Sequence, residues 1–426
     1  MKIHIRNGRL IDPKNKIDQI LDVYIAAGKI VGIGNPPNDF HANQTIDASD
    51  LIICPGLVDL SARLREPGFE HKATLESEMQ AAIAGGVTSL ACPPDTDPVL
   101  DEPGLVEMLK HRAKQLNLAH VYPLGALTKE LAGKELTEMS ELTEAGCRGF
   151  AQADISITDT QVLWRAMQYA ATFGYTVWLR PEEPFLAKNG VAHDGEVSAR
   201  LGLKGIPEAA ETLAIASIIR IARETGAKVH LCRLSTSEGV EMVRQAKIEG
   251  SSITCDVSAN HLHLTELDIG YFDANSHLRP PLRSQRDRDR LRTGVADGTI
   301  DAICSDHTPV DDDAKLLPFA ESEAGATGLE LLLPLTLKWA YESKTPLMKA
   351  FEVITSAPAK ILGVSGGHVS LNYDANLCIF DPNVYWKIEP KALRSQGKNT
   401  PFLGLEVPGK VRYTLVNGHI VYQSKI

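Results

Sequence analysis

The middle of the chain alternates short apolar segments with amphipathic ones. The amphipathic segments have the periodicity of helices and include residues 105–116, 160–171, 208–224 and 237–248. The predicted strands between them end near Asp59, Cys92, Leu124, Phe150, Leu179, Leu231, Val257 and Ile303. Eight such strand-then-helix units predict a closed, TIM-like (β/α)8 barrel rather than an open sheet. Functional side chains are then expected where the barrel strands end.

Both ends of the chain are rich in predicted strands. Ile3 and Ile5 alternate with polar residues, and residues 409–422 predict a hairpin whose turn is Asn417-Gly418. We therefore expect the two ends to meet in one small β-sandwich domain. The predicted boundaries are 1–54 and 367–426 for that domain, with the barrel at 55–366.

The composition argues against several classes of partner. The formal net charge is -10, and the arginine-rich stretch 283–292 alternates with aspartates, which is typical of a solvated helix face rather than a nucleic-acid site. Seven scattered cysteines without a CxxC pair suit free thiols in the cytoplasm. No apolar run is long enough to span a membrane. We expect a soluble, cytoplasmic protein that binds neither nucleic acid nor membrane.

Motifs along almost the whole chain resemble those of the dihydroorotases. They are Cys54-Pro55-Gly56-Leu57-Val58-Asp59-Leu60, Leu64-Arg65-Glu66-Pro67-Gly68, Pro94-Asp95-Thr96-Asp97-Pro98, Arg279-Pro280-Pro281-Leu282-Arg283 and Ser305-Asp306-His307-Thr308-Pro309. The resemblance implies a barrel of the metal-dependent hydrolase type. It also implies zinc held by two histidines after strand one, an aspartate or carboxylated lysine after strand four, histidines after strands five and six, and an aspartate after strand eight.

The positions that match these zinc ligands carry other residues. They are Ser61 and Arg63 after strand one, Gln152 or Ala153 after strand four, Arg180 after strand five, Arg233 after strand six, and Asp306 after strand eight. A catalytic zinc needs about three protein ligands, and only Asp306 remains. Arginine side chains also repel a dication. We therefore expect no zinc, and we expect Asp306, Glu182 and Asp154 to form buried ion pairs with these arginines.

Three further positions match substrate contacts of the family. Arg65 matches the residue that binds the substrate carboxylate, although it could instead join the ion pairs. Asp95 and Arg279 each replace an asparagine, which weakens the case for dihydroorotate binding. His261 and His263 could share a strand face and hold a relocated metal, but no nearby cysteine or carboxylate completes the set. The charge run 311–313 suits a solvated loop, a mobile lid or a partner contact.

Two functions remain open. The main prediction is a catalytically inactive homologue that serves as an assembly subunit of aspartate carbamoyltransferase in pyrimidine biosynthesis. The resemblance implies six copies of each chain in a hetero-dodecamer. The alternative is an active cyclic amide hydrolase that uses Asp306 as a base with an atypical or single-metal site, while arginines stabilise an oxyanion. Metal analysis and an assay with dihydroorotate would distinguish the two.

Overall fold

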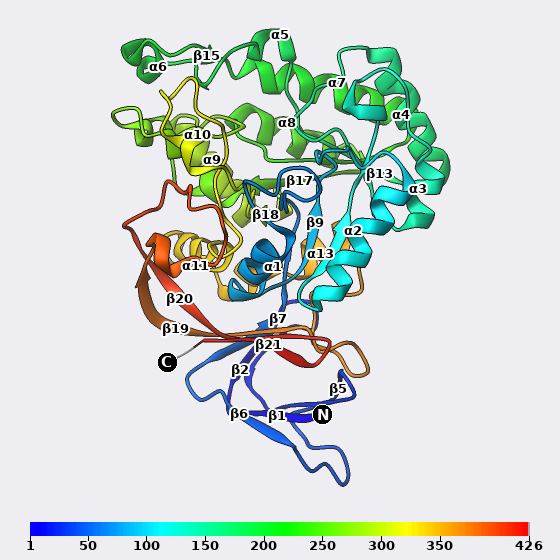
Figure 1. Ribbon diagram of the computed structural model, residues 1–426, viewed down its shortest axis with the longest axis vertical. Helices are drawn as coiled ribbons and strands as arrows, with labels where there is room; N and C mark the ends of the chain where they lie inside the picture. The colour runs from blue at the N-terminus through cyan, green and yellow to red at the C-terminus, as the bar shows by residue number, and fades with distance from the viewer. Residues whose placement is uncertain (425–426) are drawn as a thin grey trace.

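The computed structural model describes residues 1–424 as a (β/α)8 barrel joined to a small β domain (Figure 1). The barrel strands are β8 (Leu57–Asp59), β9 (Val87–Cys92), β10 (His120–Pro123) with its continuation β11 (Gly125–Ala126), β12 (Phe150–Ala151), β13 (Thr176–Leu179), β16 (Lys228–Leu231), β17 (Ile253–Ser258) and β18 (Ala302–Cys304). Neighbouring strands in this series run parallel. The predicted barrel is therefore confirmed.

The barrel closes where its last strand meets its first. The backbone N–H of His307 donates to the carbonyl of Ser61 at 3.0 Å, and the N–H of Arg63 donates to the carbonyl of His307 at 2.9 Å. Ser305, directly after β18, also donates its N–H to the buried Asp59 carboxylate at 2.8 Å. This contact brings residues 61–63 beside residues 305–307 at the carboxyl ends of the strands.

Helices surround the barrel, and apolar side chains on their inner faces pack against the strands. The main ones are α1 (Leu75–Ala84), α2 (Pro103–Leu116), α3 (Met139–Ala145), α4 (Thr160–Phe173), α7 (Ala209–Thr225), α8 (Ser237–Ile248), α9 (Gln285–Asp297) and α11 (Leu332–Ser343). Each predicted helix lies within two residues of its observed bounds. The helical periodicity therefore located the outer layer correctly.

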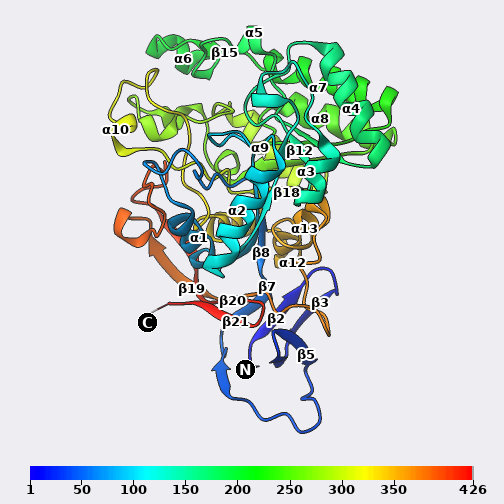
Figure 2. The same cartoon turned by 45° about the vertical axis from the view of Figure 1, so that its right-hand side comes forward.

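The other end of the barrel is closed by a short helix. Ala359 and Leu362 of α13 (Ser356–Leu362) pack with Val58, Trp178 and Cys304, whose side chains fill the barrel interior. Figure 2 shows α13 and α12 (Leu347–Glu352) between the barrel and the β domain. The interior is therefore packed at this end, and the opposite end carries the loops that follow the strands.

The β domain is built from both ends of the chain. One sheet has the strand order β5-β4-β1-β6, and the other has the order β21-β20-β19-β7-β2-β3. The strands are β1 (Lys2–Arg6), β2 (Arg9–Asp12), β3 (Ile17–Ile20), β4 (Val23–Ala26), β5 (Lys29–Ile33), β6 (Gln44–Asp47), β7 (Ile52–Pro55), β19 (Leu377–Lys387), β20 (Glu406–Val416) and β21 (His419–Gln423). β7 pairs antiparallel with β19, so strands from the two ends lie side by side. Among the described residues, no helix is long and apolar enough to cross a membrane.

Candidate active site

The loops that follow the barrel strands turn sharply at four matched positions. Arg65, Ala153, Arg233 and Asp306 all have φ between +50° and +63°. This left-handed conformation is uncommon for residues other than glycine and breaks the side-chain alternation of a strand. At Ala153 it directs the following residue, Asp154, into the barrel mouth. These turns bring the charged side chains together.

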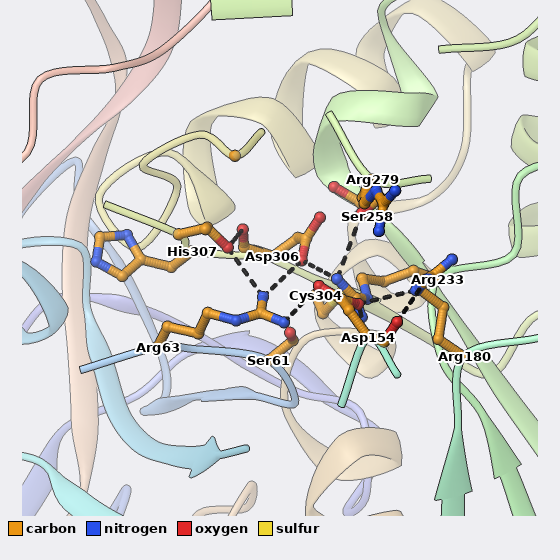
Figure 3. Close-up of polar contacts among 12 residues, drawn as sticks. Ser61, Arg63, Asp154, Arg180, Arg233, Ser258, Arg279, Cys304, Asp306 and His307 are labelled. Atoms are coloured by element: carbon orange, nitrogen blue, oxygen red, sulfur yellow. Dashed lines mark hydrogen bonds and ion pairs between the residues drawn. The ribbon is translucent and has the colours of Figure 1, made fainter. Parts of the chain in front are cut away.

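Asp154 is the centre of a cluster of three arginines (Figure 3). Its Oδ2 accepts a hydrogen bond from Arg63 Nη2 at 2.7 Å, and its Oδ1 accepts from Arg180 Nε at 2.8 Å and from Arg233 Nη2 at 2.5 Å. Arg180 also forms a bidentate ion pair with Glu182, in which Nη1 donates to Oε2 at 2.7 Å and Nη2 donates to Oε1 at 2.9 Å. Arg63 Nε donates to Asp95 at 2.7 Å. The expected ion pairs of Asp154 and Glu182 are therefore present.

Asp306 lies beside this cluster and is only 5% exposed. Its Oδ1 accepts a hydrogen bond from Arg233 Nη1 at 2.9 Å and lies 3.8 Å from Arg63 Nη1. No residue between 1 and 424 hydrogen-bonds its Oδ2, and Figure 3 shows one carboxylate oxygen directed away from the arginines. One oxygen is therefore held in place and the other is free to meet a small molecule.

The two aspartates differ in their acidity. Burial opposes ionisation of both, but the guanidinium groups of Arg233, Arg63 and Arg180 hold the pKa of Asp154 well below its usual range. Burial raises the pKa of Asp306, and the negative charge of Asp154 adds to the effect, while Arg233 and Arg63 only partly offset it. Asp154 is thus a fixed anion, whereas Asp306 is a better proton acceptor than an ordinary aspartate.

The other matched positions have different surroundings. Gln152 is buried away from the arginines and donates to Thr128 at 2.9 Å and to the carbonyl of Leu131 at 2.8 Å. Ser61 lies beside Arg63 (Figure 3), with its carbonyl bonded to His307. Arg65 donates to the carbonyl of Pro309 at 2.8 Å and lies 3.7 Å from Glu323, so it joins ion pairs outside the Asp154 cluster.

Arg279 is the exception among the cations at the mouth. It is half-buried, and no carboxylate between residues 1 and 424 forms an ion pair with it. Its carbonyl accepts a weak hydrogen bond from Arg233 at 3.4 Å. Its positive charge also contributes to lowering the pKa of Glu182. Arg279 therefore has an uncommitted guanidinium close to the ion-pair cluster.

The expectation that His261 and His263 share a strand face was wrong. His261 lies in the 3-10 helix η2 (Ala259–Leu262) rather than in a strand, and it contacts the carbonyl of Pro281 at 3.2 Å. His263 contacts the carbonyl of Leu335 at 2.8 Å, so the two rings diverge. His230 faces the barrel interior, where its ring packs on Trp178 with centroids 4.3 Å apart.

The residues at the implied zinc position do not fit a zinc ion. The space between the strand ends holds three guanidinium groups, and their hydrogen bonds occupy both oxygens of Asp154 and one oxygen of Asp306. A dication here would face positive charge from several sides. The matched positions therefore offer charged guanidinium and carboxylate groups to a substrate in place of zinc ligands.

Two other groups of side chains could hold a metal ion. One comprises His230, Cys232 and Asp256, directly below the mouth, and the other comprises His193, Glu208 and Asp287. In the first group His230 Nε2 lies 2.9 Å from Asp256 Oδ2 and Nδ1 lies 2.8 Å from Thr254 Oγ1. Burial also raises the pKa of the Cys232 thiol. A metal ion here would have to displace the hydrogen bond between His230 and Asp256, which are two of its own ligands.

Sequence reasoning missed the buried framework behind Asp306. His307 Nε2 lies 2.6 Å from Glu78 Oε2, which also accepts a hydrogen bond from Ser395 at 2.6 Å. The other ring nitrogen, Nδ1, accepts the N–H of Gly328 at 3.0 Å. Glu78 lies on the buried face of α1 between Leu75 and Ala82, and a charged residue on that apolar face was the available signal. This network fixes the loop that carries Asp306.

Comparison with known proteins gives matches over the whole chain. A family model described as "Dihydro-orotase-like" matches residues 50–239. A dihydroorotase-like protein of Pseudomonas aeruginosa is 42% identical over 424 residues, covering 100% of both chains. A protein of a Geobacter species named dihydroorotase is 39% identical over 424 residues, again covering 100% of both chains.

Solved structures support the fold. The L-hydantoinase of Arthrobacter aurescens superposes with a TM-score of 0.88 at 24% identity, covering 99% of this chain and 96% of that one. The dihydropyrimidinase of Brevibacillus agri gives 0.82 at 20% identity, covering 99% and 95%. Identities this low establish the shared architecture alone.

These comparisons contradict two predictions. The chain was expected to be catalytically inactive, but relatives 36% to 39% identical over essentially their full length are named dihydroorotase, the name of an enzyme. The expectation that zinc is absent is contradicted as well, because the resemblance links that activity to zinc and the structure holds two groups of potential metal ligands. Counting ligands only at the matched strand ends overlooked the group of His230 on β16, Cys232 directly after β16, and Asp256 on β17.

The evidence for the family is consistent along the chain. The motifs, the barrel with its two-ended β domain, the family model and the full-length relatives all agree. The chain belongs to the dihydroorotase-like family.

Proposed function

We propose that this protein is a cyclic amide hydrolase that acts on a dihydroorotate-like substrate at the carboxyl end of the barrel. The observation that carries the proposal is the state of Asp306. Its carboxylate is buried, its pKa is raised, one oxygen is held by Arg233, and the other oxygen is free. A general base needs this combination of a fixed position and an increased proton affinity.

The chemistry follows from the neighbouring charges. The free oxygen of Asp306 accepts a proton from water as the water oxygen attacks the ring carbonyl, and the C–N bond of the ring then breaks with proton return to nitrogen. The carbonyl oxygen becomes negative in this step, and a preorganised cationic donor stabilises it. Arg279, whose guanidinium has no carboxylate partner in residues 1–424, is available for this role or for the substrate carboxylate. The Asp154 cluster keeps the surrounding arginines fixed.

The test measures interconversion of dihydroorotate and N-carbamoyl-aspartate in both directions with purified protein. Asp306→Asn should abolish turnover, because the amide cannot accept the proton, while the similar shape preserves the fold. Asp289→Asn, on the exposed side of α9, is the matched control and should retain wild-type activity. Parallel samples treated with chelator or supplied with zinc show whether an ion contributes.

Two results would contradict the proposal. One is the absence of turnover by the wild-type protein in either direction, with or without zinc. The other is an Asp306→Asn variant that is as active as the wild type. Circular dichroism of each variant shows that a loss of activity reflects chemistry rather than unfolding.

We further propose that the protein associates, in the cytoplasm, with the catalytic chain of aspartate carbamoyltransferase, six copies of each. Exposed apolar side chains beside the mouth support an interaction surface: Tyr271 is 93% exposed and Leu316 is 82% exposed. Their loops are joined, because Lys315 donates to the carbonyl of Ala274 at 2.9 Å. Co-expression and light scattering should give one large species, which Tyr271→Ser with Leu316→Ser should weaken. Separate elution of the two wild-type chains would contradict this association.

A further inference from the structure

A second hollow lies at the opposite end of the barrel from Asp306. It is a cleft of about 1260 Å³ that runs below the first residues of β12, β13, β16, β17 and β18. These five strands are consecutive neighbours in one sheet, so the cleft follows an arc of the barrel rim. Residues of α13 and the β2–β3 turn of the β domain form its other wall.

The charge of this cleft is opposite to that of the whole chain. Five basic side chains line it, against Asp301 and Glu352, although the chain carries a net charge of -10. Both acids are already neutralised: Asp301 pairs with Lys247 at 2.6 Å and Glu352 pairs with Lys349 at 3.0 Å. The four other basic residues are exposed and form no ion pair within residues 1–424; they are Lys14, Arg148, Lys228 and Lys360.

The walls of the cleft add neutral donors and flat apolar surface. Hydroxyl groups of Thr176, Ser252 and Ser356 line it, whereas those of Thr143 and Thr254 already contact Met139 and His230. The half-buried ring of Tyr175 lies on the same wall and packs against the fully buried ring of Phe150, with centroids 5.3 Å apart. Cationic and hydroxyl donors bind phosphate oxygens, and aromatic surface favours a flat heterocycle. The cleft therefore offers both kinds of surface in one place.

We propose that this cleft binds a nucleoside di- or triphosphate. The unpaired lysines and Arg148 provide charge for two or more phosphate groups, and the half-buried ring of Tyr175 provides a surface for the base. The volume exceeds the 300–1,000 Å³ or so that is typical of small-molecule pockets, so a nucleotide fits within it. The site is separated from Asp306 by the packed barrel interior, so the proposal does not depend on the proposed hydrolase activity.

Isothermal titration calorimetry of the full-length protein tests the proposal, with ADP, inorganic pyrophosphate and adenosine as separate titrants. ADP should bind, pyrophosphate should bind more weakly, and adenosine should bind weakest. The double variant Lys228→Glu with Lys360→Glu should weaken ADP binding by about tenfold or more, because two attractions become repulsions. Binding should also weaken as salt is raised.

The matched control carries the same two charge reversals elsewhere on the surface. Lys134→Glu with Lys204→Glu changes two exposed lysines that do not line the cleft and should bind ADP like the wild type. The proposal is overturned if the wild type binds neither ADP nor pyrophosphate, if adenosine binds as tightly as ADP, or if both double variants bind ADP equally. All substituted side chains are exposed, so the variants should fold, and circular dichroism checks this.

Discussion

Replacing Asp154 with asparagine tests the ion-pair cluster directly. The carboxylate accepts hydrogen bonds from Arg63, Arg180 and Arg233. In the Asp154→Asn variant one oxygen becomes an amide nitrogen, which cannot accept from a guanidinium. At least one N–H group of an arginine then loses its partner inside the mouth, and the attraction between Asp154 and three cations disappears.

The expected loss of stability follows from the burial of the cluster. Removing one partner of a buried ion pair costs about 3–5 kcal/mol. The Asp154 side chain is 27% exposed, whereas the three arginine side chains are at most 6% exposed. Water can therefore reach the position of residue 154 and replace part of the lost interaction. We expect a decrease of about 3 kcal/mol in the free energy of unfolding at pH 7.

The loss should depend on pH in a defined direction. The pKa of Asp154 is depressed in the folded protein, so its stabilising contribution is complete above the unfolded pKa of about 3.9 and decreases as the pH falls toward the folded value. The difference between wild type and variant should be constant from about pH 5 to 8 and should be smaller by about 1 kcal/mol at pH 3. Urea unfolding followed by circular dichroism and fluorescence measures both values.

Asp39→Asn provides the matched control. Asp39 is exposed and has a φ of +55°, which asparagine also tolerates, so this variant should remain within about 0.5 kcal/mol of the wild type. If Asp154→Asn lowers the stability by less than about 1 kcal/mol at pH 7, or if its effect is the same at pH 3, the cluster does not hold the mouth together as argued.

Two further substitutions test the framework around the site. Glu78→Gln should lower the free energy of unfolding by about 3 kcal/mol in urea titrations, because an amide cannot accept all the hydrogen bonds from His307, Ser395 and Gln396; an unchanged midpoint would contradict this. Gly86→Ala should lower the melting temperature, because Gly86 has a φ of +83° and the added Cβ would lie 2.5 Å from Cys378 Sγ. Gly104→Ala in α2, with no atom within 4 Å of its added Cβ, is the control, and equal melting temperatures for the two variants would count against the packing argument.

The comparisons changed the functional interpretation more than the fold. Counting ligands at the strand ends predicted a catalytically inactive chain, and relatives named dihydroorotase contradict that prediction. The assignment of the positions was correct, because Arg63, Arg180 and Arg233 occupy three of the strand ends where the family has zinc ligands. The step from missing histidines to missing activity was wrong, because it considered only the matched strand ends and took no account of the potential metal ligands deeper in the barrel.

The sequence by itself determined the elements and their order. Periodicity located the helices, and the Asn417-Gly418 turn between β20 and β21 followed from local chemistry. Interactions within a few residues decide such features, so a single sequence is sufficient to predict them. The motifs in turn identified the strand ends that face the mouth.

Only the tertiary structure decided which side chains meet there. Left-handed turns at Ala153 and Arg233 let Arg233 meet Asp154, which also binds Arg63, 91 residues away in the chain. The same closure of the barrel leaves Asp306 with one free oxygen and turns His230 inward onto Trp178. A backbone torsion of this kind is set by the fit of the whole loop against neighbouring strands, and residue spacing carries no record of it.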